Sequence, residues 1–504
     1  MMTPRTIKMT QKAVNSIEEL ITIQLRRSGT QIRGPYRMNS RQKNPESQRN
    51  MLVNKKIFHG YDIRGVVNKD LTPKVSYAIG CALVTLLQKE QPQQRLQIVV
   101  GRDMRSHSLS LQENLIQGLL ASGADVIDIG LVSTPAYFFA VSFLKADGGV
   151  MVSASHNPPE YNGFKITRSM GAMMSGQTGL LAIAQIIEEE DFLWTDKPGI
   201  LLRKDGIPEK AMEAELALLS KDPIGHFSVV ADSGNGMGAQ YLDLFFEKNP
   251  FVVHRLYWEL DGTFPHHPPD PSRGENTRDL CQMVLEQKAD VGIATDGDGD
   301  RLFLVDEQGQ IVRSEVLLAL LSQIILRRFP HSSICYDIRP GRIREEMIKV
   351  AGGVPIEARA GNPFIKASMQ EHGAILGGEL SGHYFLKSPY GIFETPVAVL
   401  GLVLQEMTGT QKSLSELVLG LRKYVHPDEM NFSVQDKDVL LKKLKTHYAD
   451  AHMQEIDGIS VTYPDVWFNI RASNTEPFVR LNIEGISEEA IQKYLPQLLS
   501  LIQA

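Results

Sequence analysis

The chain has 504 residues, of which 42% are hydrophobic and 22% charged, and its formal net charge is −6. This length exceeds what one hydrophobic core can hold, so we expect three or four domains. The longest apolar runs, such as 316–321, are too short for a membrane-spanning helix. Cys81, Cys281 and Cys335 lie far apart without metal-ligand spacing, which excludes a disulfide scaffold and favours reduced thiols in a cytoplasmic protein.

The first 51 residues differ from the rest in charge. Residues 1–50 hold ten Lys and Arg against three Glu, a net charge of +7, which leaves −13 for the remainder. Apolar residues between 14 and 25 follow helical spacing and are compatible with a short amphipathic helix. For 1–51 we predict a dispensable, mostly disordered extension that arises from a start upstream of Met51. A basic organellar transit peptide and a nucleic-acid-binding segment are the alternatives.

In the first unit, strand-like runs at 96–100, 124–129 and 149–152 accompany an expected helix at 108–121. This βαβ pattern, which recurs along the chain, predicts mixed or parallel sheets covered by helices. The last run breaks into Ser-Ala-Ser-His-Asn-Pro-Pro, which cannot continue a central strand. Ser155 is therefore a candidate nucleophile on a proline-braced loop at the end of a strand. Taken alone, the segment is better explained as an ordinary capped turn.

A second unit has expected strands at 229–231 and 291–294. Ser-Gly-Asn-Gly-Met-Gly, which follows the first of them, lacks the spacing of a dinucleotide-binding motif, so we interpret it as a tight turn. Thr-Asp-Gly-Asp-Gly-Asp-Arg at 295–301 follows the second strand. Three carboxylates at alternate positions repel one another unless a cation lies between them, and Mg²⁺ prefers oxygen ligands of this kind. The sequence predicts that Asp296, Asp298 and Asp300 bind Mg²⁺. An EF-hand is excluded because an Arg, residue 301, stands where that loop requires Gly.

A third unit carries a polar loop after an apolar run. The loop reads Gly-Gly-Glu-Leu-Ser-Gly-His, and Glu379, Ser381 and His383 could bind adjacent hydroxyls of a sugar ring. On its own this is a weak signal, because a lone Glu or His near a turn is more often structural. The other expected elements of this unit are helices at 315–328 and 343–350 and a strand at 334–338.

The last unit differs, because two strands, at 465–471 and 478–484, flank the loop Arg-Ala-Ser-Asn-Thr-Glu-Pro-Phe-Val-Arg, and a helix follows at 488–501. The guanidinium groups of Arg471 and Arg480 can bind a phosphate dianion bidentately, and the hydroxyls, amide and loop N–H groups between them can complete the site. This order of elements predicts an α+β domain.

Together, the four loops resemble those of the α-D-phosphohexomutase family, specifically its bacterial phosphomannomutase/phosphoglucomutase branch. The resemblance extends from Phe-His-Gly-Tyr-Asp-Ile-Arg-Gly at 58–65 to the C-terminus. It implies three α/β mixed-sheet domains plus a C-terminal α+β domain around a central cleft. The expected limits are 52–201 for domain 1 with the phosphoserine loop, 202–308 for domain 2 with the metal loop, 309–424 for domain 3 with the sugar-recognition loop, and 425–504 for domain 4 with the phosphate-binding loop.

The resemblance also implies roles for individual residues. Ser155 would carry the phosphoryl group and would be a metal ligand together with Asp296, Asp298 and Asp300. The other catalytic positions would be Arg64, His156, Lys165, Arg301 and His383. The substrate-binding positions would be Tyr61, Arg339, Glu379, Ser381, His383, Arg471, Ser473, Asn474, Thr475 and Arg480.

The implied reaction is a Mg²⁺-dependent interconversion of hexose 1-phosphate and hexose 6-phosphate, with mannose, glucose or both as the sugar. Phosphoserine 155 would convert the substrate into a hexose 1,6-bisphosphate, which would turn round in the cleft and return its other phosphate. Glucose 1,6-bisphosphate or mannose 1,6-bisphosphate is the implied activator. We expect a phosphosugar substrate, no nucleic-acid or membrane partner, and a monomer or weak dimer. A phosphoserine-dependent sugar phosphatase or phosphotransferase, and a non-catalytic sugar-phosphate-binding protein, are the alternatives.

Two positions bear on the choice of substrate. Leu380 favours the mannose/glucose branch, because the phosphoglucosamine branch carries Gln there. Asn362 stands where many relatives have His, which leaves open how the third domain contacts the substrate. Arg339 and Arg342 could compensate for the missing imidazole, or they could be ordinary residues at the start of a helix.

Overall fold

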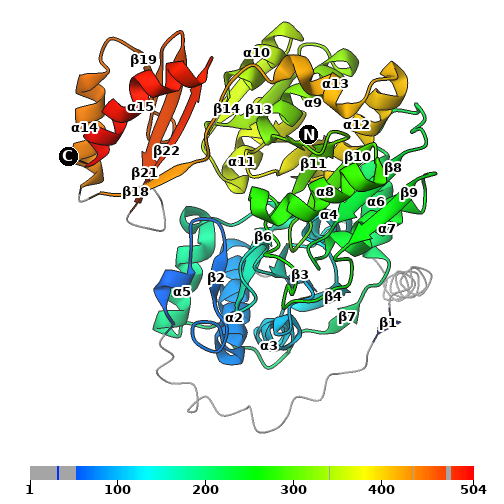
Figure 1. The fold of residues 1–504 in the computed structure, drawn as a ribbon. Coiled ribbons are helices and arrows are strands. Elements are labelled where there is room, and N and C mark those ends of the chain that lie inside the picture. Colours follow the sequence, from blue (N-terminus) through cyan, green and yellow to red (C-terminus); the bar gives the residue numbers. More distant parts are fainter. Residues whose placement is uncertain are drawn as a thin grey trace, which may run out of the picture.

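The computed structural model describes residues 31–32, 53–92, 94–339, 341–434, 436–472 and 478–503. These residues form four sheets that follow one another along the chain (Figure 1). The expected fold class, three mixed-sheet α/β domains followed by an α+β domain, is confirmed. The predicted extension at 1–51 lies outside the described residues, apart from the short strand β1 (Gln31–Ile32). In the described part of the chain, no helix combines the length and the apolar character needed to cross a membrane.

The first domain alternates strands and helices: β2 (Ile63–Val66), α2 (Pro73–Glu90), β3 (Gln97–Arg102), α3 (Ser108–Ala121), β4 (Asp125–Leu131), α4 (Thr134–Phe143), β5 (Gly148–Val152), β6 (Tyr161–Arg168), α5 (Leu181–Glu189) and β7 (Leu201–Arg203). Its sheet has the order β1-β7-β4-β3-β5-β6-β2, with a parallel centre and antiparallel edges. The expected helix is confirmed as α3, and the three expected strands as β3, β4 and β5, within two residues at each end.

The second domain contains α6 (Ile207–Leu216), β8 (Ser228–Asp232), α7 (Gly238–Phe246), β9 (Val252–Leu256), α8 (Arg278–Gln287), β10 (Val291–Thr295), β11 (Leu302–Asp306) and β12 (Ile311–Val312), in the sheet order β12-β11-β10-β8-β9. The glycine-rich segment between β8 and α7 is the expected turn. β10 and β11 pair antiparallel, with Thr295 opposite Leu302, so the acidic loop is the tip of a hairpin. The exclusion of an EF-hand is therefore confirmed.

The third domain contains α9 (Ser314–Arg328), β13 (Ser333–Asp337), α10 (Arg342–Val350), β14 (Val354–Ala358), α11 (Asn362–His372), β15 (Leu376–Gly378), β16 (Tyr384–Ser388), β17 (Gly391–Glu394), α12 (Pro396–Thr410) and α13 (Leu414–Val418). Its sheet has the order β14-β13-β15-β16-β17 and, like the second sheet, changes from parallel to antiparallel pairing. The sugar-recognition loop connects β15 to β16.

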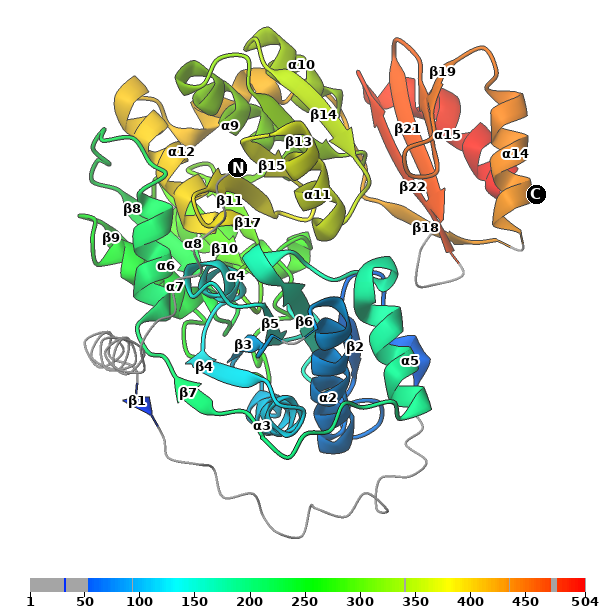
Figure 2. The same ribbon diagram turned by 180° about the vertical axis from the view of Figure 1, so that it is seen from behind.

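The fourth domain contains β18 (Met430–Ser433), α14 (Lys437–His447), β19 (His452–Gln454), β20 (Ile459–Thr462), β21 (Val466–Ala472), β22 (Phe478–Gly485) and α15 (Glu488–Gln503). Its sheet, β18-β22-β21-β20-β19, is antiparallel throughout. Both views show this domain beside the third (Figure 2).

One large hydrophobic core joins the first three domains. Its central element is α4, which begins at the N-cap Ser133 and is buried along almost its whole length. Phe139 of α4 packs against Tyr390 and Phe393 of the third domain, with ring centroids 4.9 and 6.4 Å apart. The fourth domain packs a separate core between its sheet and its two helices. The first three domains therefore form one packed body, to which the fourth is attached.

A buried carboxylate holds this shared core together. Glu215 on α6 is 0% exposed, and it accepts hydrogen bonds from Tyr241 Oη at 2.7 Å and from the N–H of Ala398 in α12 at 2.9 Å. Glu215→Ala would leave both donors buried without a partner. We expect the free energy of unfolding, measured by urea denaturation, to fall by about 2–5 kcal/mol. An unchanged unfolding midpoint would contradict this role.

The same carboxylate should make stability depend on pH. Burial raises the pKa of Glu215 from 4.5 to about 7. The folded state therefore keeps this proton where the unfolded state has lost it, so the stabilisation is complete below pH 4.5 and is lost as the pH rises through 7. Between those values the wild type should lose stability relative to Glu215→Gln, which does not titrate. If the free energies of unfolding of the two proteins changed in parallel with pH, Glu215 would not contribute to the pH dependence of stability.

Candidate active site

All four predicted loops converge on one cavity of about 930 Å³ between the domains. Its lining includes Tyr61, Arg64, Ser155, His156, Lys165, Arg301, Arg339, Glu379, Ser381, His383, Arg471 and Arg480. Asp300 also lines the cavity, and Asp296 and Asp298 are buried behind it. Three residues of the predicted phosphate-binding loop, Ser473, Asn474 and Thr475, lie outside the described residues. The structure thus brings most of the predicted site together.

Ser155 lies in the loop between β5 and β6, in a constrained backbone conformation. Its φ is 51°, a left-handed value that costs a non-glycine residue on the order of 1–3 kcal/mol, so the surrounding structure must hold it in place. Arg105, only 2% exposed, donates to the carbonyl oxygens of Ser155 (2.8 Å), Asn157 (2.5 Å), Pro158 (2.7 Å) and Tyr161 (3.0 Å). One guanidinium therefore fixes the whole loop that presents the serine.

The Ser155 hydroxyl faces an acid and an imidazole. Its Oγ donates to Asp296 Oδ2 at 2.6 Å and lies 3.2 Å from His156 Nδ1. Burial, together with the positive charges of Arg301 and Arg64, holds the pKa of His156 well below its ordinary value. A neutral imidazole therefore lies beside the hydroxyl.

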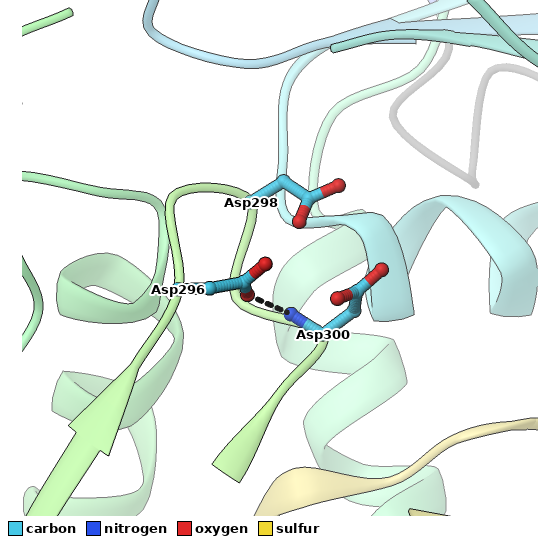
Figure 3. Close-up of side chains that lie close together, drawn as sticks. All are labelled: Asp296, Asp298 and Asp300. Carbon is cyan, nitrogen blue, oxygen red and sulfur yellow. Dashed lines mark hydrogen bonds between the residues drawn. The ribbon is translucent and has the colours of Figure 1, made fainter. Parts of the chain in front are cut away.

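The three aspartates of the metal loop gather around one point (Figure 3). One ligand atom from each of Asp296, Asp298 and Asp300 lies within 4.8 Å of the others. The backbone N–H of Asp300 donates to Asp296 Oδ1 at 3.1 Å, which closes the loop. A Cβ on Gly297 would lie 2.5 Å from the carbonyl oxygen of Ser155, so only glycine lets this loop approach the serine so closely.

The trio fits a hard divalent cation. Burial raises the pKa of Asp296, and the neighbouring charges of Asp300 and Asp298 raise it further, because carboxylates this close together repel one another. Asp298 Oδ1 is buried and has no hydrogen-bond partner among the described residues. Buried carboxylate oxygens with free lone pairs are the ligands that Mg²⁺ prefers. The residues present could therefore hold such an ion.

Lys165 supplies a fixed positive charge at the same place. Its Nζ lies 2.7 Å from Asp298 Oδ2 and 2.5 Å from Asp300 Oδ2. Burial disfavours the ammonium form, yet these two carboxylates outweigh burial and raise the pKa of Lys165 above its ordinary value. Thr134, at the start of α4, donates its hydroxyl to Asp298 Oδ2 at 2.6 Å, so the first domain helps to hold the metal loop.

The sugar-recognition loop connects to the metal loop through His383. His383 Nε2 lies 3.1 Å from Asp300 Oδ1, and Nδ1 lies 3.2 Å from Glu379 Oε2 and 2.9 Å from Ser381 Oγ. Burial disfavours protonation, but the Asp300 carboxylate outweighs it and raises the pKa of His383 to about 9. The imidazolium is therefore held between two carboxylates, with Ser381 at the cavity wall.

The other residues of the third domain have distinct positions. Arg339 lines the cavity and donates from Nε to Asp337 Oδ2 at 2.9 Å. Asn362 also lines the cavity, and its amide donates to Glu394, a buried carboxylate that also pairs with Lys366 at 3.0 Å. Arg342 instead pairs with Glu484 of the fourth domain at 3.3 Å. Of the two arginines proposed to compensate for the missing imidazole, only Arg339 reaches the cavity.

Several residues that position these groups were not predicted. They are Asp62, Arg105, Thr134, Asn157, Asp337 and Glu429. Three of them had a local signal: Asp62 and Asp337 each stand two residues before an arginine and accept from its Nε, at 2.8 Å from Arg64 and 2.9 Å from Arg339, and Asn157 stands two residues after Ser155. Nothing in the sequence connects the others to their partners, which lie far away along the chain.

Comparisons with known proteins agree with this geometry. Four families described as phosphoglucomutase/phosphomannomutase match in order: alpha/beta/alpha domain I at 55–194, domain II at 210–309, domain III at 313–424 and the C-terminal domain at 429–501. A phosphomannomutase of Methanocaldococcus jannaschii is 34% identical over 451 residues, covering 88% of this chain and 97% of the relative. A phosphomannomutase/phosphoglucomutase of Pseudomonas aeruginosa is 34% identical over 442 residues, covering 87% and 93%.

A solved structure extends the similarity to the fold. A phosphoglucomutase/phosphomannomutase family protein from Burkholderia thailandensis superimposes with a TM-score of 0.81 at 31% identity, covering 90% of this chain and 98% of that one. All four domains, the serine loop, the aspartate trio and the arginine pair thus agree with one assignment. The chain belongs to the phosphoglucomutase/phosphomannomutase family, whose members transfer phosphate within sugar phosphates.

Proposed function

We propose that this chain is a Mg²⁺-dependent phosphohexomutase that interconverts the 1- and 6-phosphates of mannose, glucose or both. One observation carries the proposal: Ser155 Oγ, on a residue only 2% exposed, is 2.6 Å from an aspartate of a buried trio, at a cavity that Arg471 and Arg480 line on its fourth-domain side. A nucleophile and a phosphate-binding pair at separate places in one cavity suit a substrate that carries phosphate at either end.

Asp296, Asp298 and Asp300, together with an oxygen of Ser155, would hold the metal ion. Mg²⁺ in this place would neutralise the charge of the transferring phosphoryl group. This chain's own cations would add to that effect, because Lys165 and Arg301 pair with aspartates of the trio and Arg64 lines the same cavity. Such charge compensation and positioning account for most of the catalysis of phosphoryl transfer.

The proposed exchange has two steps. In the first, the P–O bond of phosphoserine 155 breaks as a bond forms to the free hydroxyl of the hexose monophosphate, and that hydroxyl loses its proton. In the second, the bisphosphate has turned round, its other phosphate returns to Ser155, and a sugar hydroxyl regains a proton. We propose that Lys165 and His383, both of which line the cavity, move these protons: a group that gives its proton to the departing Ser155 Oγ can then take the proton of the sugar hydroxyl, and the reverse holds in the second step. Closure around the substrate would exclude water, which otherwise hydrolyses the phosphoserine.

The proposed substrate contacts come from the family resemblance, and the lining of the cavity supports them. Glu379 and Ser381 would bind the sugar hydroxyls, with Tyr61 and Arg339 beside them, and Arg471 and Arg480 would hold the phosphate that does not react. Relatives named phosphomannomutase and phosphoglucomutase are 34% and 33% identical to this chain, so identity does not favour one sugar. We therefore propose both sugars.

³¹P NMR tests the proposal. Mannose 1-phosphate and glucose 1-phosphate are incubated separately with the protein, Mg²⁺ and a trace of glucose 1,6-bisphosphate, which we propose as the activator. Conversion to the 6-phosphate by the wild type but not by Ser155→Ala is expected. Release of inorganic phosphate instead would indicate a phosphatase. No change in either substrate would overturn the proposed sugar specificity.

We further propose a cytoplasmic location, a monomer or weak dimer, and domain limits near residues 201, 308 and 424, with all of β7 (Leu201–Arg203) kept in the first domain. The location is supported by the three cysteines, all of which are free thiols. The oligomeric state can be measured by light scattering coupled to size-exclusion chromatography.

A further inference from the structure

Arg471 and Arg480 of the fourth domain line the cavity, whereas Glu429 does not. Glu429 pairs with both arginines. Its Oε2 lies 3.0 Å from Arg471 Nη2, and its Oε1 lies 3.2 Å from Arg480 Nη1. Asn482, itself 0% exposed, donates from Nδ2 to Glu429 Oε2 at 2.9 Å. One carboxylate thus joins the two guanidinium groups from behind.

The register of the strands explains why a carboxylate is needed there. Arg471 on β21 and Arg480 on β22 are directly paired, so their side chains leave the same face of the sheet. Like charges at directly opposed positions repel each other and destabilise a sheet. Glu429 comes immediately before β18, which pairs with β22 on its other side, and this places its carboxylate between the two cations.

Within the described part of the chain, not every donor of the pair is used. Arg471 Nε and Arg480 Nε are buried and have no hydrogen-bond partner among the residues that the structure describes. The side chain of Arg471 is 8% exposed and that of Arg480 is 31% exposed, so Arg471 is the more constrained of the two. Free arginine side chains lose considerable rotamer entropy on binding a ligand, and prior fixing removes part of that cost.

Three other arginines at this cavity are arranged in the same way. Arg64 is paired with Asp62 at 2.8 Å, Arg339 with Asp337, and Arg301 with Asp270 at 3.6 Å. A carboxylate behind each guanidinium is therefore a repeated feature of this site. Asp337 also pairs with a second arginine, Arg344, at 3.3 Å, but Arg344 does not line the cavity. Glu429 differs because both arginines that it pairs with line the cavity.

We propose that Glu429 is a positioning residue for phosphate binding: it holds Arg471 and Arg480 in a fixed arrangement that accepts the substrate's non-reacting phosphate. This inference rests on the proposed function, because it takes a phosphosugar as the ligand. Glu429 contacts the ligand only through the two arginines. Its removal should therefore weaken binding much more than it slows the chemical step.

Calorimetric titration tests binding without turnover. Ser155→Ala is the parent, Mg²⁺ is present, and glucose 1-phosphate and inorganic phosphate are the probes. Glu429→Ala should raise the Kd of both about tenfold, the effect of one charge-assisted hydrogen bond. Glu429→Gln should change it in the same direction, because an amide has one acceptor oxygen for two guanidiniums. The matched control is Glu455→Ala, whose side chain is 60% exposed and pairs with Lys445 in the same domain.

A double-mutant cycle separates positioning from a general structural role. If Glu429 acts through the arginines, adding Glu429→Ala to the Arg471→Ala/Arg480→Ala variant should leave the Kd unchanged. In otherwise wild-type protein with mutase activity, Glu429→Ala should raise KM and leave kcat within about threefold. If Glu429→Ala lowered the affinity equally with and without the two arginines, the proposal would be overturned. Tighter binding by Glu429→Gln would also overturn it, because it would show that the carboxylate competes with phosphate for the arginines.

The two proposals can fail separately. If the wild type does not interconvert sugar phosphates, the function is wrong, but the titration still decides whether Glu429 supports phosphate binding. If the Ser155→Ala parent binds neither probe, the arginine pair is not a phosphate site, and the proposed positioning role of Glu429 is also wrong.

Discussion

Ser155→Ala is expected to abolish interconversion of hexose phosphates, lowering kcat at least about 10⁴-fold, because it removes the atom that carries the phosphoryl group. The side chain is small and the backbone of the loop is fixed by Arg105, so the fold should be retained. Turnover can be followed by ³¹P NMR, and the phosphoserine by intact-protein mass spectrometry after incubation with glucose 1,6-bisphosphate.

Ser142→Ala is the matched control for this variant. Ser142 is a buried serine on α4 that does not line the cavity, so the same chemical change there should leave turnover near the wild-type value. If Ser155→Ala retained near-normal turnover, or if its mass still increased by one phosphoryl group, another nucleophile would carry the reaction.

Asp298→Asn is expected to weaken metal binding at least about 100-fold and to lower the rate at saturating substrate. Asp298 is 0% exposed, and its Oδ2 accepts hydrogen bonds from Lys165 and Thr134 while its Oδ1 has no partner among the described residues. The asparagine amide would place an N–H donor beside groups that themselves donate hydrogen bonds. The substitution would also remove one of the three negative charges that attract a cation. The change is neutral in volume, so packing should not be affected.

The measurement is a titration of Mn²⁺, followed by the electron paramagnetic resonance of the free ion, in parallel with the Mg²⁺ dependence of the rate. Asp232→Asn is the control, because Asp232 is a buried aspartate at the end of β8 that lies outside the trio. Equal metal affinity in the wild type and in Asp298→Asn would show that the acidic loop is not the metal site.

Local signals account for what could be predicted. α3 was predicted from its apolar spacing, and the strands that precede the serine loop and the metal loop from short apolar runs bounded by turn residues. The serine, the three aspartates and the Glu379–His383 group were found because each chemical group lies within a few residues of the next. Their common cavity was implied by family resemblance, since spacing within one loop does not show which loops meet.

Three of the residues that were missed, Arg105, Thr134 and Glu429, contact residues far away along the chain. Thr134 and Asp298 are 164 residues apart, and Glu429 and Arg471 are 42 apart. A threonine at the start of a helix, or a glutamate before a strand, has an ordinary local explanation as a cap or a surface charge. Only the strand register reveals that Arg471 and Arg480 face each other and that Glu429 lies between them.

By itself, the sequence predicted the chemical groups of the candidate site: a candidate serine nucleophile and a trio of carboxylates, each on a loop after a strand, and a pair of guanidiniums on the two strands beside a loop. Those assignments depend on the types of neighbouring residues, which are local properties. The tertiary structure decided which side chains are constrained and by what. Tyr61 reaches the carbonyl of Ala360, 299 residues away, and one arginine fixes four carbonyls of the serine loop. Such contacts form when distant segments pack and bury their polar groups, so they are determined by the whole fold.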